Sequence, residues 1–321
     1  MPVLFLAFLL CIWLLYLKIT GTSHQRFEEG PAWLTCWMKD IPDDTLLRKI
    51  VIPGSHDSGT AGTIWAAETQ VYSFKQQLET GIRYFDTRVH KKGDKYFIFH
   101  SIIDGVEFPP ILKDVSKFLD DNPSEVILLD FQHFKGESQS DVAKMLIDIL
   151  GDKLLHNESQ DSNLDFIHNL TLGEARGKCI AFWGDRNDEL ADFKFVRNDN
   201  ECTTGEQCLD SFYLRDCHHG DTSRLINEGH PEYFGRARML EDKGKSGVFV
   251  LQCQLGDSKV VFGPYSKEKN HDEPISKYIC DLPNHPDFDL VNVIMRDFIC
   301  PRKVIDIINL NSYKDNLFHS H

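Results

Sequence analysis

Ionisable side chains occur where several apolar segments of the chain end: His56, Asp57, Asp86, Arg88, His100 and Asp297. Glycines flank His56 and Asp57 within residues 53–60, which suits a tight turn that presents both groups together. Asp86 and Arg88 are two residues apart, so on a strand they point to the same face. Taken singly, each histidine fits a satisfied polar group, and the acid and the arginine fit a structural ion pair. Together, the six suit acid–base chemistry around a developing negative charge.

Strand-like and helix-like segments alternate along the chain and must position these groups. The apolar runs that predict buried strands are Lys49–Ile52, Ile82–Val89, Lys95–His100, Val126–Phe131, Lys178–Trp183, Gly247–Cys253 and Val291–Asp297. Helix-like patterns occupy Pro109–Leu119, Ser140–Leu150 and Val304–Leu310. This alternation predicts an α/β fold with a mostly parallel sheet, and seven strands favour a closed barrel. In such a barrel the strand ends meet at one face, where active sites form.

The composition is that of a folded, acidic protein. The 321 residues are 41% hydrophobic and 26% charged, which excludes long disorder. The formal net charge of −14 argues against a nucleic-acid partner, because phosphate backbones are bound by cationic surfaces. No linker or internal repeat divides the chain, so we expect a single domain over residues 24–321. We infer no obligate protein partner. A Cys-rich stretch near residues 197–235 is predicted to be an excursion from this domain.

Residues 1–23 predict a targeting segment. An apolar run spans Val3–Leu17 and is followed by Lys18 and by small residues. The run is short for a transmembrane helix and typical of a signal peptide, with retention as a signal anchor as the alternative. We therefore expect a secreted protein or one that resides in the lumen of the secretory pathway.

The cysteines and two sequons agree with export. The chain has nine cysteines; Cys11 lies in the leader, and an even number remains for an oxidising compartment, which predicts disulfides. The alternative is that several are buried thiols, and Cys179 and Cys253, inside strand-like runs, are the candidates. Sequons at Asn157 and Asn169 predict a glycoprotein.

An ordered series of motifs resembles the X domain of the phosphatidylinositol-specific phospholipases C. The series comprises residues 37–43 (WMKDIPD), 50–60 (IVIPGSHDSGT), 81–88 (GIRYFDTR), 97–100 (FIFH), 121–129 (DNPSEVILL), 176–178 (RGK) and 293–298 (VIMRDF). The resemblance runs from Trp37 to Asn311, with residues 187–245 poorly matched. It implies an irregular TIM-type (β/α) barrel, which agrees with the strand pattern.

The resemblance implies a role for each of the six residues. His56 would be the general base that takes the proton from the inositol 2-hydroxyl, and His100 would be the general acid that protonates the leaving oxygen. Arg88 would stabilise charge on the phosphoryl oxygens. The supporting acids would be Asp297 beside His56, Asp57 beside His100 and Asp86 beside Arg88.

We expect no metal and no other cofactor. Calcium-dependent members of the family have an oxygen ligand two residues after the first acid of the second strand, where this chain has Arg88. A guanidinium cannot bind Ca²⁺, and its fixed positive charge can serve the same electrostatic purpose. The resemblance is therefore to the bacterial-type, metal-independent branch, which includes eukaryotic proteins with a single X domain.

The residues expected to bind the inositol head group depart from the bacterial pattern. Gln132 stands where the bacterial enzymes have a lysine, and a later arginine position falls near Gly184, with Arg186 close by. Phe212 and Tyr213 are the candidates for stacking on the inositol ring. The catalytic set is thus retained and the head-group set is not.

These observations predict a phospholipase C-like phosphodiesterase that releases diacylglycerol and a cyclic inositol phosphate. Its partner would be phosphatidylinositol or a glycan-linked inositol lipid at a membrane surface. Ile64 and Trp65, after the catalytic turn, are candidates for bilayer contact or for a helix core. One alternative is a catalytically weak relative that binds lipid or inositol phosphate, which the departures at Gln132 and Gly184 motivate. The other is a Mg²⁺-dependent barrel phosphodiesterase, which Arg88 disfavours.

Overall fold

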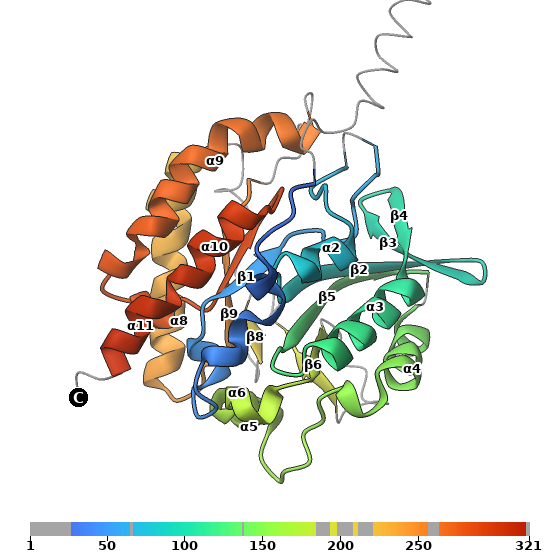
Figure 1. The fold of residues 1–321 in the computed structure, drawn as a ribbon, viewed down its shortest axis with the longest axis horizontal. Coiled ribbons are helices and arrows are strands. Elements are labelled where there is room, and N and C mark those ends of the chain that lie inside the picture. Colours follow the sequence, from blue (N-terminus) through green and yellow to red (C-terminus); the bar gives the residue numbers. More distant parts are fainter. Residues whose placement is uncertain are drawn as a thin grey trace, which may run out of the picture.

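A barrel of parallel strands forms the centre of the molecule (Figure 1). The computed structural model describes residues 27–64, 67–136, 138–183, 193–197, 208–210, 221–255 and 263–318. In these residues the barrel strands are β1 (Ile52–Ser55), β2 (Tyr84–Lys92), β5 (Ile127–Lys135), β6 (Cys179–Trp183), β7 (Lys194–Val196), β8 (Leu209–Asp210), β9 (Val248–Gln252) and β10 (Val293–Arg296). They pair in the order β7-β6-β5-β2-β1-β10-β9-β8. A bridge between Arg197 and Leu209 joins β7 to β8, so the predicted α/β barrel is confirmed.

The third strand of the chain does not belong to the barrel wall, contrary to the prediction. β3 (Lys95–His100) pairs antiparallel with β2, and β4 (Ile103–Glu107) pairs antiparallel with β3. Gly93, with a φ of +61°, lies in the tight turn between β2 and β3, which makes a hairpin rather than a crossover. The hairpin returns the chain toward the barrel, so His100 reaches the barrel mouth from β3 and not from the end of a parallel strand.

Helices surround the barrel. The three predicted helices are confirmed as α3 (Phe108–Asp121), α4 (Gln139–Leu150) and α10 (Pro301–Asn309). The other α-helices in the described residues are α2 (Phe74–Glu79), α5 (Asn163–Asn169), α6 (Leu172–Ala175), α7 (Thr222–Arg224), α8 (His230–Asp242), α9 (Gly263–Asp281) and α11 (Asn311–Phe318). Short 3₁₀ segments are η1 (Ala32–Asp40), η2 (Leu47–Lys49), η3 (Gly151–Lys153), η6 (Leu282–Asn284) and η7 (Phe288–Leu290), and η5 (Leu225–Gly229) is a π-helix. Of the predicted strand Lys49–Ile52, Lys49 is the last residue of η2 and only Ile52 belongs to β1.

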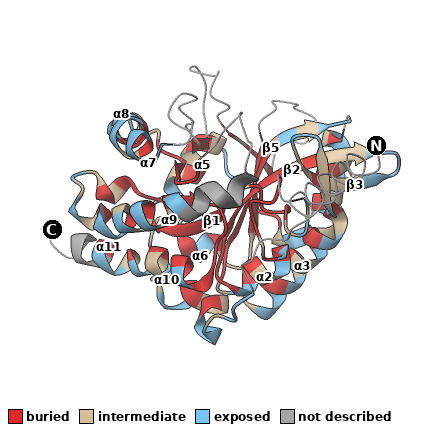
Figure 2. Cartoon of the chain, turned by 90° about the horizontal axis from the view of Figure 1, so that it is seen from above, coloured by how far each residue is buried: buried red, intermediate tan, exposed pale blue. Residues whose placement is uncertain are grey.

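Alternate residues of each barrel strand face the barrel interior and the surrounding helices. On β5, Leu128 packs inside the barrel with Tyr84, whereas Leu129 and Phe131 pack against α3 and α4. Figure 2 shows the result: the strands are buried at the centre, and the helices around them bury their inner faces. Asp130 follows Leu128 by two residues and continues the inward-facing row. Inward-facing polar side chains at the position of Asp130 along the strands therefore face the mouth of the barrel.

A buried ion pair ties the N-terminal segment to the base of the barrel. Arg83 and Glu125 have no exposed surface, and Arg83 Nε donates to Glu125 Oε2 at 2.8 Å. The guanidinium also donates to the carbonyls of Leu34 (3.1 Å) and Thr35 (2.9 Å) in η1. Glu125 Oε1 accepts a hydrogen bond from Met38 N at 3.1 Å. The pair is thus fully hydrogen-bonded, which is the condition under which a buried charge pair is tolerated.

We expect the Glu125→Leu substitution to lower the free energy of unfolding by about 3–5 kcal/mol, because it leaves the Arg83 guanidinium buried without its counterion. Urea denaturation measures the loss. Removal of the exposed pair Lys117–Asp121 through Lys117→Ala is the control and should cost less than about 1 kcal/mol. A Glu125→Leu protein as stable as the Lys117→Ala protein would contradict this account.

The predicted disulfide framework is wrong for four of the cysteines. Cys36, Cys179, Cys280 and Cys300 are free thiols. Cys179 lies fully buried on β6, and burial raises the pKa of its thiol, so the alternative of a buried thiol is confirmed there. Cys202 and Cys217 lie outside the described residues.

The structure leaves the predicted leader and excursion partly untested. Residues 1–23 lie outside the part of the chain that the structure describes. In the part that is described, no helix has both the length and the hydropathy that a membrane span requires. The stretch predicted as an excursion contains β8, which is part of the barrel wall. Of the two sequon asparagines, Asn157 is half-buried and Asn169 is exposed at the end of α5.

Candidate active site

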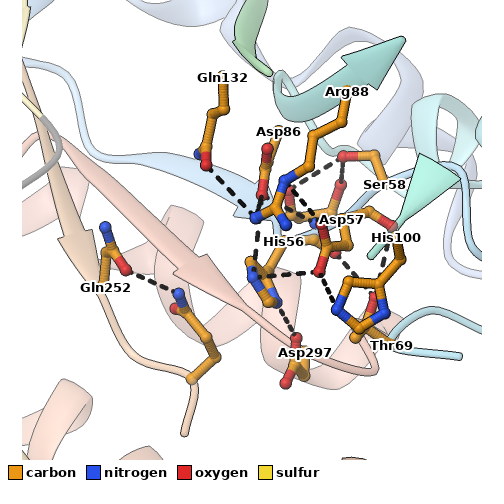
Figure 3. A network of polar contacts seen from close by, with 12 residues as sticks. His56, Asp57, Ser58, Thr69, Asp86, Arg88, His100, Gln132, Gln252 and Asp297 are labelled. Atoms are coloured by element: carbon orange, nitrogen blue, oxygen red, sulfur yellow. Dashed lines mark hydrogen bonds and ion pairs between the residues drawn. The ribbon is translucent and has the colours of Figure 1, made fainter. Parts of the chain in front are cut away.

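The six predicted catalytic residues lie together at one end of the barrel (Figure 3). His56 and Asp57 follow β1, and Asp297 follows β10, which pairs with β1 in parallel. Backbone hydrogen bonds anchor the turn after β1: Asp57 N donates to Asp86 Oδ2 (3.1 Å), and Ser58 N donates to Asp86 O (3.0 Å). Asp57 has a φ of +45°, which a short polar side chain tolerates better than a branched one.

His56 is bound by three carboxylates. Its Nδ1 lies 2.7 Å from Asp297 Oδ1, and its Nε2 lies 3.3 Å from Asp57 Oδ2 and 3.8 Å from Asp86 Oδ2. Burial alone would lower the pKa of His56, but the charges of Asp57, Asp297 and Asp86 outweigh it and raise the pKa to about 9. With Nδ1–H donated to Asp297, Nε2 is the nitrogen that can accept a proton at the site.

Asp57 connects both histidines and the arginine. Its Oδ2 lies 3.4 Å from His100 Nε2 as well as 3.3 Å from His56 Nε2, and its Oδ1 lies 3.0 Å from Arg88 Nε. Burial would raise the pKa of this carboxyl, but the positive charges of Arg88, His56 and His100 lower it to about 2. Asp57 therefore remains ionised and carries the negative charge between the two imidazoles.

Arg88 contacts three side chains at the centre of the site. Besides Asp57, its Nη2 donates to Asp86 Oδ2 at 3.2 Å and to Gln132 Oε1 at 3.4 Å. Burial would lower the pKa of Arg88, but Asp57 and Asp86 raise it above its ordinary value. This charged guanidinium shares Asp57 with the two histidines. A cation held in this position can stabilise an anion that forms during acid–base catalysis.

The network predicts how the rate depends on pH. If His56 acts as a base, kcat/KM rises with pH toward about 9, because only the unprotonated imidazole accepts a proton. Asp297→Asn removes one of the negative charges that raise this pKa, so the acidic limb moves to lower pH while the maximal rate falls. The control is Asp104→Asn, since Asp104 pairs with His90 elsewhere on the hairpin. An acidic limb that stays in place or moves to higher pH in Asp297→Asn would contradict the assignment.

Comparison with known proteins places this site in a family. The family profile "Phosphatidylinositol-specific phospholipase C, X domain" matches residues 44–183. A 1-phosphatidylinositol phosphodiesterase of Staphylococcus aureus (strain Newman) is 31% identical over 259 residues, which cover 74% of this chain and 80% of that protein. The chain belongs to the phosphatidylinositol-specific phospholipase C family.

Two further similarities bear on the extent of the match. A PI-PLC X-box domain-containing protein of Dictyostelium discoideum is 34% identical over 168 residues, which are 44% of this chain but only 22% of that protein. The solved structure of the phosphatidylinositol-specific phospholipase C from Listeria monocytogenes has a TM-score of 0.65 at 21% identity, covering 87% of this chain and 98% of that one. The similarity to the Listeria structure shows a shared fold, and it covers nearly all of that structure.

The donor atoms of this phospholipase site fit a divalent cation poorly. Ligand atoms of His56, Asp57 and Asp86 lie within 4.8 Å of one another, a spacing that a metal ion could use. However, Arg88 already forms ion pairs with both carboxylates. A cation would have to displace a buried guanidinium or share its charge, and the two positive charges would repel each other.

The expected head-group residues divide into one that reaches the site and three that lie outside the described residues. Gln132 lies beside Arg88 (Figure 3). Arg186, Phe212 and Tyr213 are not among the described residues, so their role in substrate binding stays a prediction. Ile64 is 38% exposed, whereas Trp65 lies outside the described residues.

The sequence reasoning missed Gln70, which connects the turn after β1 to the segment after β10. Its buried Nε2 donates to His56 O (2.9 Å) and Arg296 O (3.0 Å), and its Oε1 accepts from Ile299 N (3.1 Å). Nothing in its local sequence indicates this role, because Arg296 and Ile299 are 226 and 229 residues away along the chain.

The reasoning also missed a buried polar group beneath Gln132. Asp130 interrupts the apolar run Val126–Phe131 and shares a strand face with Gln132. The sequence did contain a signal for this group: Asp130 is an acid inside an apolar strand, two residues before a predicted site residue. Its contacts are described below.

Proposed function

We propose that this protein is a phospholipase C-type phosphodiesterase that cleaves phosphatidylinositol or a glycan-linked inositol lipid. The observation that carries the proposal is the placement of Arg88 and two histidines around one carboxylate at the barrel mouth, in a member of this family. Two proton-transfer groups beside a fixed cation are what an in-line displacement at phosphorus requires.

In the proposed reaction, His56 Nε2 accepts the proton of the inositol 2-hydroxyl. The freed oxygen attacks phosphorus and forms a new P–O bond, while the P–O bond to diacylglycerol breaks. His100 donates a proton to the departing oxygen, so the products are diacylglycerol and a 1,2-cyclic inositol phosphate. Asp297 keeps His56 in the tautomer that accepts at Nε2, and Asp57 stabilises the charge of His100. Arg88 stabilises the charge that develops on the phosphoryl oxygens.

The test is release of cyclic inositol phosphate from phosphatidylinositol vesicles by purified protein in the presence of EDTA. We expect full activity, because the cation of the site is Arg88. Activity lost in EDTA and restored by Mg²⁺ would favour a metal-dependent phosphodiesterase. Vesicle binding without product would favour a binding protein, and either result would overturn the proposal.

We also propose that the protein acts at a membrane surface in the secretory pathway or outside the cell. The apolar run Val3–Leu17 and the sequons at Asn157 and Asn169 support this location. The intact mass of protein recovered from a secretory host tests it, since cleavage of the leader and glycosylation change the mass in opposite directions. Recovery of the unmodified full-length mass from the cytosol would contradict it.

A further inference from the structure

Arg88 takes its position from three oxygen atoms on different segments of the chain. Asp57 lies in the turn after β1, Asp86 lies on β2, and Gln132 lies on β5. The carboxylates fix Nε and one side of Nη2. The contact of Nη2 with Gln132 Oε1 is the only one of the three in which the acceptor is neutral, so its geometry depends on which way the amide is turned.

The orientation of the Gln132 amide is set by Asp130. Gln132 Nε2 donates to Asp130 Oδ2 at 3.3 Å, and this contact directs Oε1 toward Arg88. If the amide were reversed, its N–H groups would face the N–H groups of Arg88 and the carbonyl would face a carboxylate. Both contacts would then be repulsive.

The backbone places Gln132 for this role. Along the β2–β5 ladder, Thr87 pairs with Phe131 and Arg88 pairs with His133, so Gln132 has no partner residue. Gln132 is therefore the extra residue of a bulge, and bulges redirect side chains next to functional sites. In a regular ladder, Arg88 would pair with Gln132 itself.

Asp130 is in turn held by groups from two other strands. It is fully buried, its Oδ2 accepts from Tyr84 Oη at 2.6 Å, and its Oδ1 lies 2.6 Å from Arg197 Nε. Tyr84 lies on β2, and Arg197 directly follows β7. Arg197 is itself nine-tenths buried, so this contact is a desolvated ion pair rather than a surface one.

We propose that Asp130, Arg197 and Gln132 form a positioning network that orients the Arg88 guanidinium for the transition state. This inference rests on the proposed function, and it gives Gln132 a different role from the head-group contact expected from the sequence. The network acts through Arg88: Arg197 and Tyr84 fix Asp130, Asp130 orients the Gln132 amide, and the amide oxygen holds Nη2.

Gln132→Met removes both amide contacts at nearly constant volume and tests the last link. We expect kcat to fall about tenfold, the value of one hydrogen bond to a charged group, with little change in KM. The matched control is Lys135→Met, a change of an exposed residue on the same strand, which should leave kcat unchanged. An increase in KM with unchanged kcat would instead show that Gln132 binds the head group, and would overturn the proposal.

The double variant Asp130→Asn/Arg197→Gln tests the first links without leaving one buried charge unpaired. It should lower kcat as Gln132→Met does, and the triple variant should be no slower than Gln132→Met alone, because all three residues act through one amide. Independent, multiplicative losses in the triple variant would contradict a single network. Thermal unfolding of each variant shows whether the fold is retained.

A readout without turnover separates this inference from the proposed function. In the substrate-free wild-type protein, NMR of the arginine side chains should show slow rotation of the Arg88 guanidinium, and Gln132→Met should accelerate it. If the wild type does not cleave the lipid but the rotation changes as expected, only the proposed function fails. If the lipid is cleaved and the rotation is the same in both proteins, only the positioning network fails.

Discussion

Replacement of His56 by alanine should lower kcat toward the upper end of the roughly 10²–10⁴-fold that a positioned acid–base group contributes. The loss should be large because the substitution removes the proposed acceptor of the hydroxyl proton and also leaves the Asp297 carboxylate without its partner at 2.7 Å. The measurement is the rate of cyclic inositol phosphate release at saturating phosphatidylinositol. His100→Ala should cause a loss of similar size, since the leaving oxygen then departs without a proton.

The chain offers a matched control for these histidine variants. His90 on β2 also pairs with a carboxylate, at 2.6 Å between its Nδ1 and Asp104 Oδ1, but this pair is separate from the Arg88 network. His90→Ala should therefore retain turnover close to that of the wild type. A His56→Ala protein that retained wild-type turnover would overturn the proposed mechanism.

The second large effect is expected at Arg88. Arg88→Met removes the cation proposed to face the reacting phosphate, and loss of one such electrostatic stabiliser costs on the order of 10²–10³ in kcat. Removing that charge also lets the pKa of Asp57 rise from about 2, because Arg88 is its strongest positive neighbour. Arg88→Lys should recover only part of the rate, since an ammonium cannot reproduce the planar geometry that engages Asp57, Asp86 and Gln132 together.

Arg238→Lys controls for a general effect of replacing an arginine that bridges two acids. Arg238 contacts Asp287 at 2.7 Å and Asp289 at 2.8 Å, and it is partly exposed on α8. Turnover should be unchanged in this variant. Full activity of Arg88→Lys would show that charge alone is sufficient and would contradict the role given to guanidinium geometry.

The strands that the sequence predicted are those with the longest apolar runs. Val126–Phe131 and Lys178–Trp183 correspond to β5 and β6, because buried parallel strands require continuous apolar segments. β7 (Lys194–Val196) and β8 (Leu209–Asp210) escape such a pattern, since two or three residues carry no recognisable period. Lys95–His100 was recognised as a strand but misplaced, because a strand pattern does not specify the direction of its partner.

The site residues were predictable to different degrees for a related reason. His56, Asp57 and Arg88 lie in motifs whose residue types indicate chemistry by themselves. Arg197 and Gln70 do not, because their importance comes from partners elsewhere in the chain, such as Asp130 for Arg197 and Arg296 for Gln70. Charge pairs and amide orientations of this kind depend on strand register, which local sequence does not encode.

By itself, the sequence determined where the longer barrel strands lie along the chain, the residue types at their ends and the resemblance to one phospholipase family. The tertiary structure alone decided that one oxygen of Asp57 lies between both histidines, that Nε2 of His56 faces the site and that a bulge redirects Gln132. The physical reason is separation along the chain: His56 and Asp297 are 241 residues apart, and only closure of the barrel brings β1 beside β10. A difference of one residue in register changes which side chains meet, so these contacts are properties of the closed barrel.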